Sequence, residues 1–440
     1  MSPSLLTLII FAALVILLMT GLPIVFVLGG LGAILTIILT GWNGLSIVAY
    51  QALNQMDNFV TVAIPLFIFI GILVERAGIA EAAFDVMYKS LGRLKGGLAV
   101  GSTIVCTLFA AMTGTAAAST IAMGTIALPQ MLKHGYDKKL SMGSIAASGT
   151  LGVLIPPSVL MVLFGLFSQD SIGQLFAGGI FAGLVMSAVF IAYILIRSYI
   201  QKDYCPALPA EERASFKEIL RASVGVIPPI IIIVLMLGSI LAGIATPTEA
   251  AGVGCVATLV CAIGRRTLTW KKFFDVLTST LRLSAMVVWI IFGSSAFAAV
   301  FSSTGAIQVV TSLISSLPVS PYIVLVGMLA VLFILGMFVD PGAIIMLTVP
   351  IFVPITRAFG FNSTWFGVLF VVLMQTGYIT PPFGFNLFYM RQIVPQETAT
   401  MQEIYKAVIP FILLMLVTTA ILVAFPAIIT WLPSILVKMA

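Results

Sequence analysis

Gly377-Tyr378-Ile379-Thr380-Pro381-Pro382 interrupts a long apolar segment of this 440-residue chain. Two consecutive prolines donate no backbone hydrogen bonds, so a helix that runs into them must break. Apolar residues lie on both sides, from Phe366 to Met374 and from Leu387 to Met390, so we expect the break inside a membrane. Irregular backbone is tolerated at membrane depth only where it lines a cavity or is buried in protein.

A second copy of this stretch, Gly152-Val153-Leu154-Ile155-Pro156-Pro157, lies 225 positions earlier in the chain. The same spacing pairs Pro129 with Pro354 and Gly135 with Gly360. The sequence therefore predicts two structural repeats, each with one broken helix. Helix breaks at matching positions of two repeats are the best indication in a sequence of a transporter's binding site.

The composition predicts an all-α polytopic membrane protein. Hydrophobic residues make up 61% of the chain and charged residues only 8%, whereas roughly a quarter of the residues in soluble domains are charged. Apolar runs of about 20 residues recur, as membrane-spanning helices require, and the strands of a membrane barrel would alternate instead. The basic residues are spread through loops without a patch of interleaved aromatics, which argues against a nucleic-acid partner.

Four basic clusters indicate which loops face the cytoplasm, because cytoplasmic loops carry an excess of Lys and Arg. The clusters are Lys89/Arg93/Lys95, Lys133/Lys138/Lys139, the segment from Arg197 to Arg221, and Arg265/Arg266/Lys271/Lys272. His134, the only histidine, lies in one of these loops and is expected to be solvated.

We expect three parts: a first repeat over 1–200, a cytoplasmic linker over 201–224 and a second repeat over 225–440. Each repeat begins with two spans, an amphipathic arm along the interface and a third span. The arms are Leu45–Asn58 and Leu268–Ser279, and the third spans are Phe59–Val74 and Leu283–Phe301.

Each repeat then continues with a hairpin, a broken helix and a closing span. The hairpins are 96–133 and 321–356, the broken helices 139–167 and 363–391, and the closing spans Leu175–Ile196 and Val408–Thr430. A hairpin could be two complete spans or one re-entrant loop, and the uncharged small residues at the first tip favour re-entry. Five full crossings per half, an odd number, would invert the second repeat relative to the first.

Hydroxyl groups and backbone carbonyls gather at the two tips and two breaks, where helix ends offer partial charges to ions. A single Ser or Thr in a membrane helix usually bonds to its own preceding turn, but clustering at both breaks favours binding. The sodium candidates are Gly114, Thr115, Ser148, Gly149, Gly152, Pro156, Asp340, Gly342, Thr376, Gly377 and Thr380. The substrate candidates are Thr113, Ser119, Thr150, Ser158, Gln375, Pro381 and Asn386.

Asp340 is the one carboxylate between Arg282 and Arg357, and an ionisable group at membrane depth is costly. In Asp340-Pro341-Gly342 it could simply cap the second arm of the hairpin, with Pro at the first helical position. Because one carboxylate can accept several bonds, we expect capping and ion coordination together.

Gln375 and Asn386 flank the second break, and of their counterparts in the first repeat only Thr150 is polar. This asymmetry predicts that the two half-sites are not equivalent. The chain shows no Ser/His/Asp set, no paired carboxylates in one segment and no phosphate-binding loop. The sequence therefore favours neither an enzyme nor a transporter driven by its own ATP hydrolysis.

Three stretches resemble a known family: the tip from Phe109 to Ala116, the run from Ala122-Met123-Gly124 to Leu128-Pro129, and Gly149-Thr150-Leu151-Gly152-Val153-Leu154-Ile155-Pro156-Pro157-Ser158. They are similar to the large membrane subunit of tripartite ATP-independent periplasmic (TRAP) transporters, and the resemblance covers essentially the whole chain. It implies an elevator-type importer of small organic anions, such as carboxylates or sialic acids, in the bacterial inner membrane. Sodium would be the coupling ion, with no other cofactor.

The resemblance also implies partners, namely a periplasmic binding protein and a small four-helix membrane subunit, together with membrane lipid. One departure is Ala116, where the family tip usually carries a hydroxyl; Thr115 and backbone carbonyls would then serve. The alternatives are a stand-alone sodium-coupled carboxylate symporter of the same wider fold and a membrane-embedded enzyme or scaffold.

Overall fold

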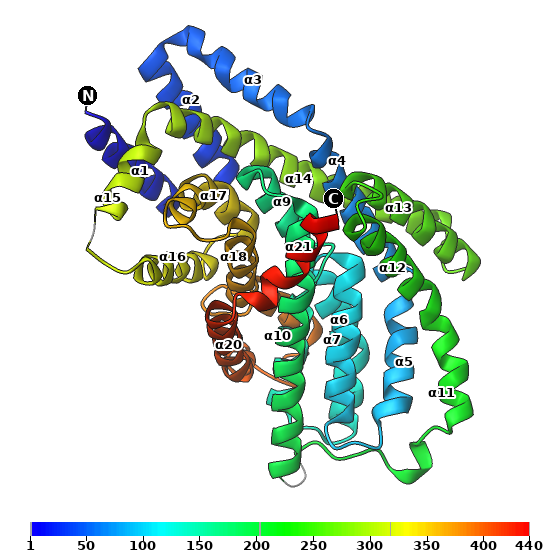
Figure 1. The fold of residues 1–440 in the computed structure, drawn as a ribbon. Helices are drawn as coiled ribbons and strands as arrows, with labels where there is room; N and C mark the ends of the chain where they lie inside the picture. The colour runs from blue at the N-terminus through cyan, green and yellow to red at the C-terminus, as the bar shows by residue number, and fades with distance from the viewer. Residues whose placement is uncertain (1, 202–203, 317, 440) are drawn as a thin grey trace.

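The computed structural model of the protein describes residues 2–201, 204–316 and 318–439, which form helices and, within these ranges, no strand (Figure 1). The first half contains α1 (Pro3–Met19), α2 (Ile24–Thr40), α3 (Leu45–Met56), α4 (Phe59–Arg76), α5 (Ile79–Leu91), α6 (Gly97–Thr113), α7 (Ala116–Lys133), α8 (Lys138–Gly149), α9 (Val159–Ser168) and α10 (Ile172–Ile200). Short 3-10 turns occur at Trp42–Gly44 and at Thr150–Val153, the latter named η2.

The second half repeats this order of helices with two differences. It contains α12 (Ile227–Leu241), α13 (Pro247–Gly264), α14 (Trp270–Ser303), α15 (Ala306–Ser315), α16 (Pro321–Gly336), α17 (Pro341–Ala358), α18 (Ser363–Gly377), α19 (Phe385–Ile393), α20 (Met401–Ala424) and α21 (Ala427–Met439). The single helix α14 stands in place of α3 and α4, and α21 follows α20. The first residues of α7 and α17, and those of α8 and α18, are separated by the spacing that separates the double prolines. The relative orientation of the halves stays a prediction.

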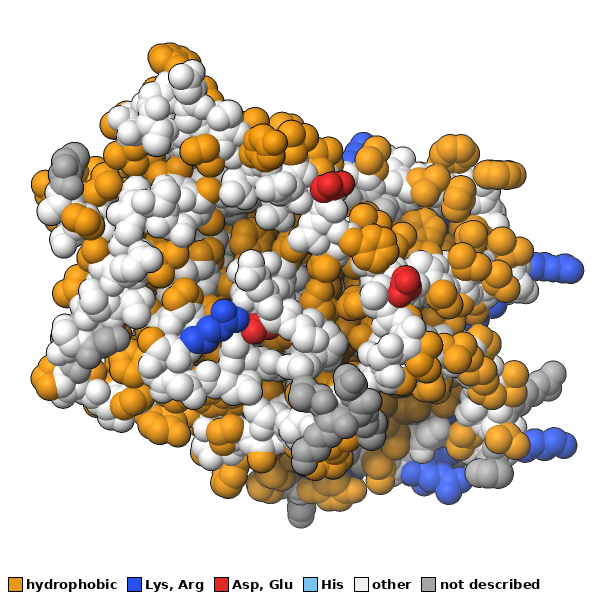
Figure 2. Space-filling view, turned by 45° about the horizontal axis from the view of Figure 1, so that its top comes forward, with side chains coloured by type: hydrophobic (Ala, Val, Ile, Leu, Met, Phe, Trp, Pro, Cys, Tyr) orange, Lys and Arg blue, Asp and Glu red, His pale blue; other side chains and the backbone are white. Residues whose placement is uncertain are grey.

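The surface is that of a multi-pass membrane protein. Seven helical stretches in the described ranges are long and apolar enough to cross a membrane. Figure 2 shows hydrophobic side chains spread over the face in view, with Lys and Arg concentrated toward one edge. Phe26 and Ile38 are 69% and 71% exposed, which is unfavourable in water but not among lipid tails, which are equally apolar.

Helix α14 packs along α2, α3 and α4, and α4 packs against α13. Glycines permit the closest of these contacts. A side chain at Gly32 would press on the backbone of Ala296, and one at Gly293 on the carbonyl of Val25. Small residues at helix interfaces let backbones approach closely, which is how membrane helices gain packing energy. We call α1 to α4 and α12 to α14 the frame.

The predicted second arm and third span are in fact one helix, α14. In the first half the arm α3 ends and Asn58 begins a new helix by accepting a hydrogen bond from the Val60 N–H. The position 225 residues later is Leu283, whose side chain cannot cap a helix. Without a cap or a turn residue, the helix continues.

The predicted closing span to Thr430 is also too long, because α20 ends at Ala424 and α21 begins at Ala427. Pro426 lies between them, and it lacks the N–H that would continue the helix. Three further helices were not expected: α5, α15 and, inside the linker, α11 (Phe216–Ser223). The linker also holds short 3-10 turns at Ala210–Glu212 and Val224–Val226, and its residues 202 and 203 lie outside the described ranges.

The expectation that His134 is solvated is wrong. Its side chain is 8% exposed and its Nε2 lies 2.9 Å from Oε2 of Glu212, a linker residue. The Tyr88 hydroxyl donates to the same oxygen at 2.8 Å. The hydrogen bonds from His134 and Tyr88 hold the pKa of Glu212 below its usual value. The linker is thereby attached to the ends of α5 and α7.

The inverted arrangement of the halves is tested by labelling. Cysteines placed at Gln201 and Ser316, after the last residues of α10 and α15, should react from the cytoplasm and from the periplasm respectively. The background should lack Cys255 and Cys261, which are partly exposed. Reaction of both positions from the same side would contradict the inversion.

Candidate functional site

Both double prolines interrupt a helix, as the sequence indicates. In the first half the chain leaves α8 after Gly149, passes through η2 and re-enters a helix at Val159. Ser158 caps α9 by accepting from the Met161 N–H at 3.3 Å and donates its own hydroxyl proton to the Val153 carbonyl. In the second half α18 ends at Gly377 and α19 begins at Phe385. The peptides Pro156-Pro157 and Pro381-Pro382 are cis.

The first hairpin tip packs closely on the first break, and glycines permit this contact. Gly114 ends α6 with a positive φ of 62°, a conformation that favours glycine. A side chain at Gly114 would collide with the carbonyl of Pro157, and one at Gly152 with the carbonyl of Thr115. The tip and the break therefore contact each other through backbone atoms, with the carbonyl of Pro157 beside Gly114 and that of Thr115 beside Gly152.

The second break packs on the second hairpin in a related way. A side chain at Gly377 would collide with the carbonyl of Gly336, at the end of α16. Asp340 begins the other arm, α17, and its Oδ1 accepts from the N–H groups of Gly342 and Ala343 at 2.9 and 3.4 Å. The capping role expected for Asp340 is thus present in the structure, and Oδ2 has no hydrogen bond from the described residues.

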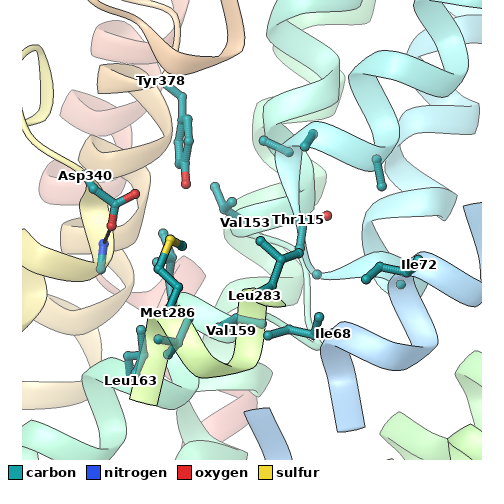
Figure 3. A pocket seen from close by; sticks show the side chains of 18 of the residues that line it. Ile68, Ile72, Thr115, Val153, Val159, Leu163, Leu283, Met286, Asp340 and Tyr378 are labelled. Atoms are coloured by element: carbon teal, nitrogen blue, oxygen red, sulfur yellow. Dashed lines mark hydrogen bonds between the residues drawn. The ribbon is translucent and has the colours of Figure 1, made fainter. Parts of the chain in front are cut away.

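A cavity of about 260 Å³ lies between these parts and the frame. Four candidates line it: Gly114, Thr115, Asp340 and Gly342. Figure 3 shows Asp340 and Tyr378 on one side of the cavity and Thr115 on the other, with Leu283 and Met286 of α14 between them. The cavity thus joins both hairpins, the second break and the frame.

Three polar residues of this cavity were missed from the sequence: Glu75, Tyr378 and Tyr389. Tyr378 belongs to the double-proline stretch itself, so its position could have suggested it. Glu75 is a lone acid at the end of the apolar helix α4, and Tyr389 lies on α19, after the break. The residues that line the cavity include no Lys, Arg or His.

The two ends of the cavity differ in charge. Thr115 precedes α7 without a side-chain hydrogen bond to it, and Ala116, Ala117 and Ala118 of the first turn line the cavity. A helix N-terminus with free N–H groups attracts anions. At α17 the corresponding position is occupied by the Asp340 carboxylate. The N-terminus of α7 therefore suits an anion and that of α17 a cation, while Glu75 of α4 adds a second carboxylate to the lining.

Gln375 and Asn386 lie away from this cavity and join the two halves. Gln375 Nε2 donates to Thr150 Oγ1 at 3.1 Å, and Asn386 Nδ2 donates to the Ala146 carbonyl at 2.6 Å. Both side chains are fully buried. Their amide oxygens, like the hydroxyls of Ser119 and Thr120, have no partner among the described residues.

The remaining hydroxyl candidates bond to backbone carbonyls of their own helix or turn. The donor–acceptor pairs are Thr113 to Phe109, Ser148 to Ser144, Thr150 to Ala147, Thr376 to Val372 and Thr380 to Thr376, at 2.6–3.0 Å. This is the local role that the sequence left open for such residues. Each hydroxyl oxygen keeps a free lone pair, so these hydrogen bonds do not prevent it from binding a cation. Cation binding by these residues stays a prediction.

The close contact at Gly377 makes a testable prediction. Gly377→Ala should destabilise the protein by about 1–3 kcal/mol, because the new methyl group overpacks against the Gly336 backbone. Gly327→Ala on α16 is the matched control, since a methyl group at that position would meet no atom within 4 Å apart from its chain neighbours and the backbone of its own helix. Thermal unfolding of the two purified variants compares them, and equal melting temperatures would contradict the contact.

Comparison with known proteins identifies the chain's relatives. A family described as "Tripartite ATP-independent periplasmic transporter, DctM component" matches residues 11–428. The C4-dicarboxylate TRAP transporter large permease protein DctM of Pseudomonas aeruginosa is 33% identical over 92% of this chain and 93% of that protein. The sialic acid TRAP transporter large permease protein SiaM of Vibrio cholerae is 30% identical, over 95% and 96%.

Among solved structures, the crystal structure of the Alcanivorax borkumensis YdaH transporter is similar, with a TM-score of 0.65 over 98% of each chain. The two sequences are 14% identical. This similarity supports the fold and says nothing about substrate.

Proposed function

Because the chain belongs to the family of DctM components of tripartite ATP-independent periplasmic transporters, we propose that it is the large permease subunit of a sodium-driven importer of small organic anions. The chain is a multi-pass membrane protein and a transporter component, not an enzyme. It would act in the bacterial inner membrane by an elevator mechanism, with a periplasmic binding protein and a small four-helix membrane subunit.

The observation that carries the proposal is the cavity with an open helix N-terminus at one end and a carboxylate at the other. A substrate carboxylate would accept hydrogen bonds from the first turn of α7. A sodium ion would bind near Asp340, whose Oδ2 is not used for capping. Ion and substrate would then neutralise each other's charge, which a cavity without lysine, arginine or histidine requires.

Two groups of oxygens support further sodium sites. The first are the backbone carbonyls at the first tip and break, and the second are the unpartnered side-chain oxygens of Ser119, Gln375 and Asn386. Buried polar atoms without partners cost about 1–3 kcal/mol each, so a bound cation that they coordinate would recover that energy. Neutral oxygens at unwound helix segments are ligands for sodium, and the charge of the substrate would balance that of the ion.

The elevator mechanism is supported by where the cavity lies. The frame contributes α4 and α14, and the hairpins and breaks contribute the opposite wall. In the proposed cycle the hairpins and broken helices move together past the frame and carry the substrate across. The two TRAP relatives described above are permeases for C4-dicarboxylates and for sialic acid, and a carboxylate is the group that these substrates share.

Reconstitution tests the function. Uptake of labelled dicarboxylates and sugar acids into proteoliposomes should require this chain, the small subunit, the binding protein and an inward sodium gradient. Omission of any one should abolish uptake. Sodium-independent uptake by this chain alone would overturn the proposal, and sodium-dependent uptake by this chain alone would favour the stand-alone symporter.

Asp340→Asn tests the cation end of the cavity. Asparagine caps a helix about as well as aspartate, so the fold should survive, but sodium-dependent uptake should fall about tenfold or more because a charged ligand is lost. Asp137→Asn is the matched control: Asp137 caps α8 through the Leu140 N–H at 2.8 Å and lies outside the cavity. Unchanged uptake and sodium dependence in Asp340→Asn would show that the carboxylate is only a cap.

A further inference from the structure

The corner between α13 and α14 contains a groove that the transport site does not use. Its volume is about 280 Å³, and it is lined by Leu259, Ile263, Leu268, Thr269, Trp270 and Phe273. Two of these side chains also face outward, since Trp270 is 77% exposed and Ile263 59%. We call this groove and its basic residues the α13–α14 corner.

Four basic residues are close in sequence to the lining residues: Arg265 and Arg266 after α13, and Lys271 and Lys272 in the first turn of α14. Arg265 donates to the Gly225 carbonyl and Lys272 to the Thr267 carbonyl. Arg266 and Lys271 are exposed and form no hydrogen bond or ion pair with the described residues.

The lysines lie where a helix least favours them. The N-terminus of a helix carries partial positive charge, so basic side chains in the first turn are destabilising. In α14 that end is capped by Thr269, which accepts from the Lys272 N–H. The dipole of α14 and the two lysines therefore reinforce one another, while Arg265 and Arg266 follow the C-terminus of α13, whose partial charge is negative. Asp275, one turn later, is the nearest acid in sequence. Such a concentration of positive charge suits an anionic ligand.

Arg266 adds a second indication. Its φ is 56°, a left-handed conformation that only one other non-glycine residue, Gln169, adopts within the described ranges. The matching position in the first half is Gly41, with φ 74°, and the segment from Thr40 to Ser46 contains no basic residue. An arginine thus occupies a position where the other half has the residue that the backbone prefers.

The excess of basic residues in cytoplasmic loops accounts for the sign of these charges. It does not account for an arginine in a left-handed conformation or for lysines at a helix N-terminus, because charges elsewhere in the loop would set topology equally well. Nor does it account for the apolar groove between α13 and α14. The combination of a basic rim and an apolar groove at a membrane-facing corner matches a lipid that has an anionic headgroup.

We propose that the α13–α14 corner binds an anionic phospholipid of the cytoplasmic leaflet. The headgroup phosphate lies between Arg266 and Lys271, and an acyl chain runs along the groove beside Trp270 and Ile263. Because α14 also packs on α2, α3 and α4, the lipid attaches the frame to the bilayer on the side from which the basic loops emerge.

The experiment measures lipid binding to the full chain in detergent, by native mass spectrometry and by the shift in apparent melting temperature. The probes are dioleoyl phosphatidylglycerol and dioleoyl phosphatidylcholine. The wild-type protein should bind and be stabilised by the phosphatidylglycerol only. Arg266→Gly/Lys271→Gln should bind it about thirtyfold more weakly, since each basic residue near an anionic lipid contributes about a fivefold gain.

Lys95→Gln/Lys139→Gln is the control, because it removes two exposed charges from other basic loops and should bind like the wild type. Arg266→Gly alone serves if the double variant folds poorly, since glycine suits the left-handed backbone. The proposal is overturned if both lipids bind equally, or if the corner variant retains binding at the control's level. It is also overturned if the added small subunit abolishes the lipid shift by covering the corner, which would then be a protein interface.

Discussion

The structure depends on one constraint: a backbone that leaves helical geometry inside a membrane must still satisfy its polar groups. The double prolines force this situation twice, at Pro156 and at Pro381. Glycines let each break and a hairpin approach until backbone meets backbone, so the irregular backbone is buried in protein and not exposed to lipid. The oxygens left over are then held at fixed positions near the centre of the fold. The candidate binding groups are therefore a direct consequence of the way the helices are broken.

In both repeats a hairpin packs closely on a helix break, but the charges at the two hairpin tips are opposite. The first hairpin ends in small residues and leaves the N-terminus of α7 open to the cavity, whereas the second places Asp340 over the N-terminus of α17. Sequence symmetry alone would give two similar half-sites. The substitution of a carboxylate at one tip makes the cavity dipolar, which suits the simultaneous binding of an anion and a cation. Each ligand then lowers the cost of burying the other.

Features that depend on local chemistry could be predicted from the sequence, and those that depend on distant contacts could not. Consecutive prolines, a glycine at the first tip and the Asp-Pro-Gly cap act on their own neighbours, so the breaks, both hairpin turns and the cap of Asp340 were expected. The continuity of α14 could have been expected too, since Leu283 cannot cap. The bond from Gln375 to Thr150 joins helices far apart in sequence. Glu75 and Tyr389 likewise reach the cavity only through packing.

The glycine contacts also bear on how the site could move. The first tip meets the rest of the protein through three of them: Gly152 on the Thr115 carbonyl, Gly114 on Pro157, and Gly71 of α4 on the Thr113 carbonyl. The first two join the tip to its own break, and only the third joins it to the frame. A contact between a glycine and a carbonyl involves dispersion forces without a hydrogen bond, and such contacts are individually weak. In the proposed elevator cycle, the tip and break can stay together while the contacts of the hairpin helices α6 and α7 with α4, Gly71 on the Thr113 carbonyl among them, are exchanged for others.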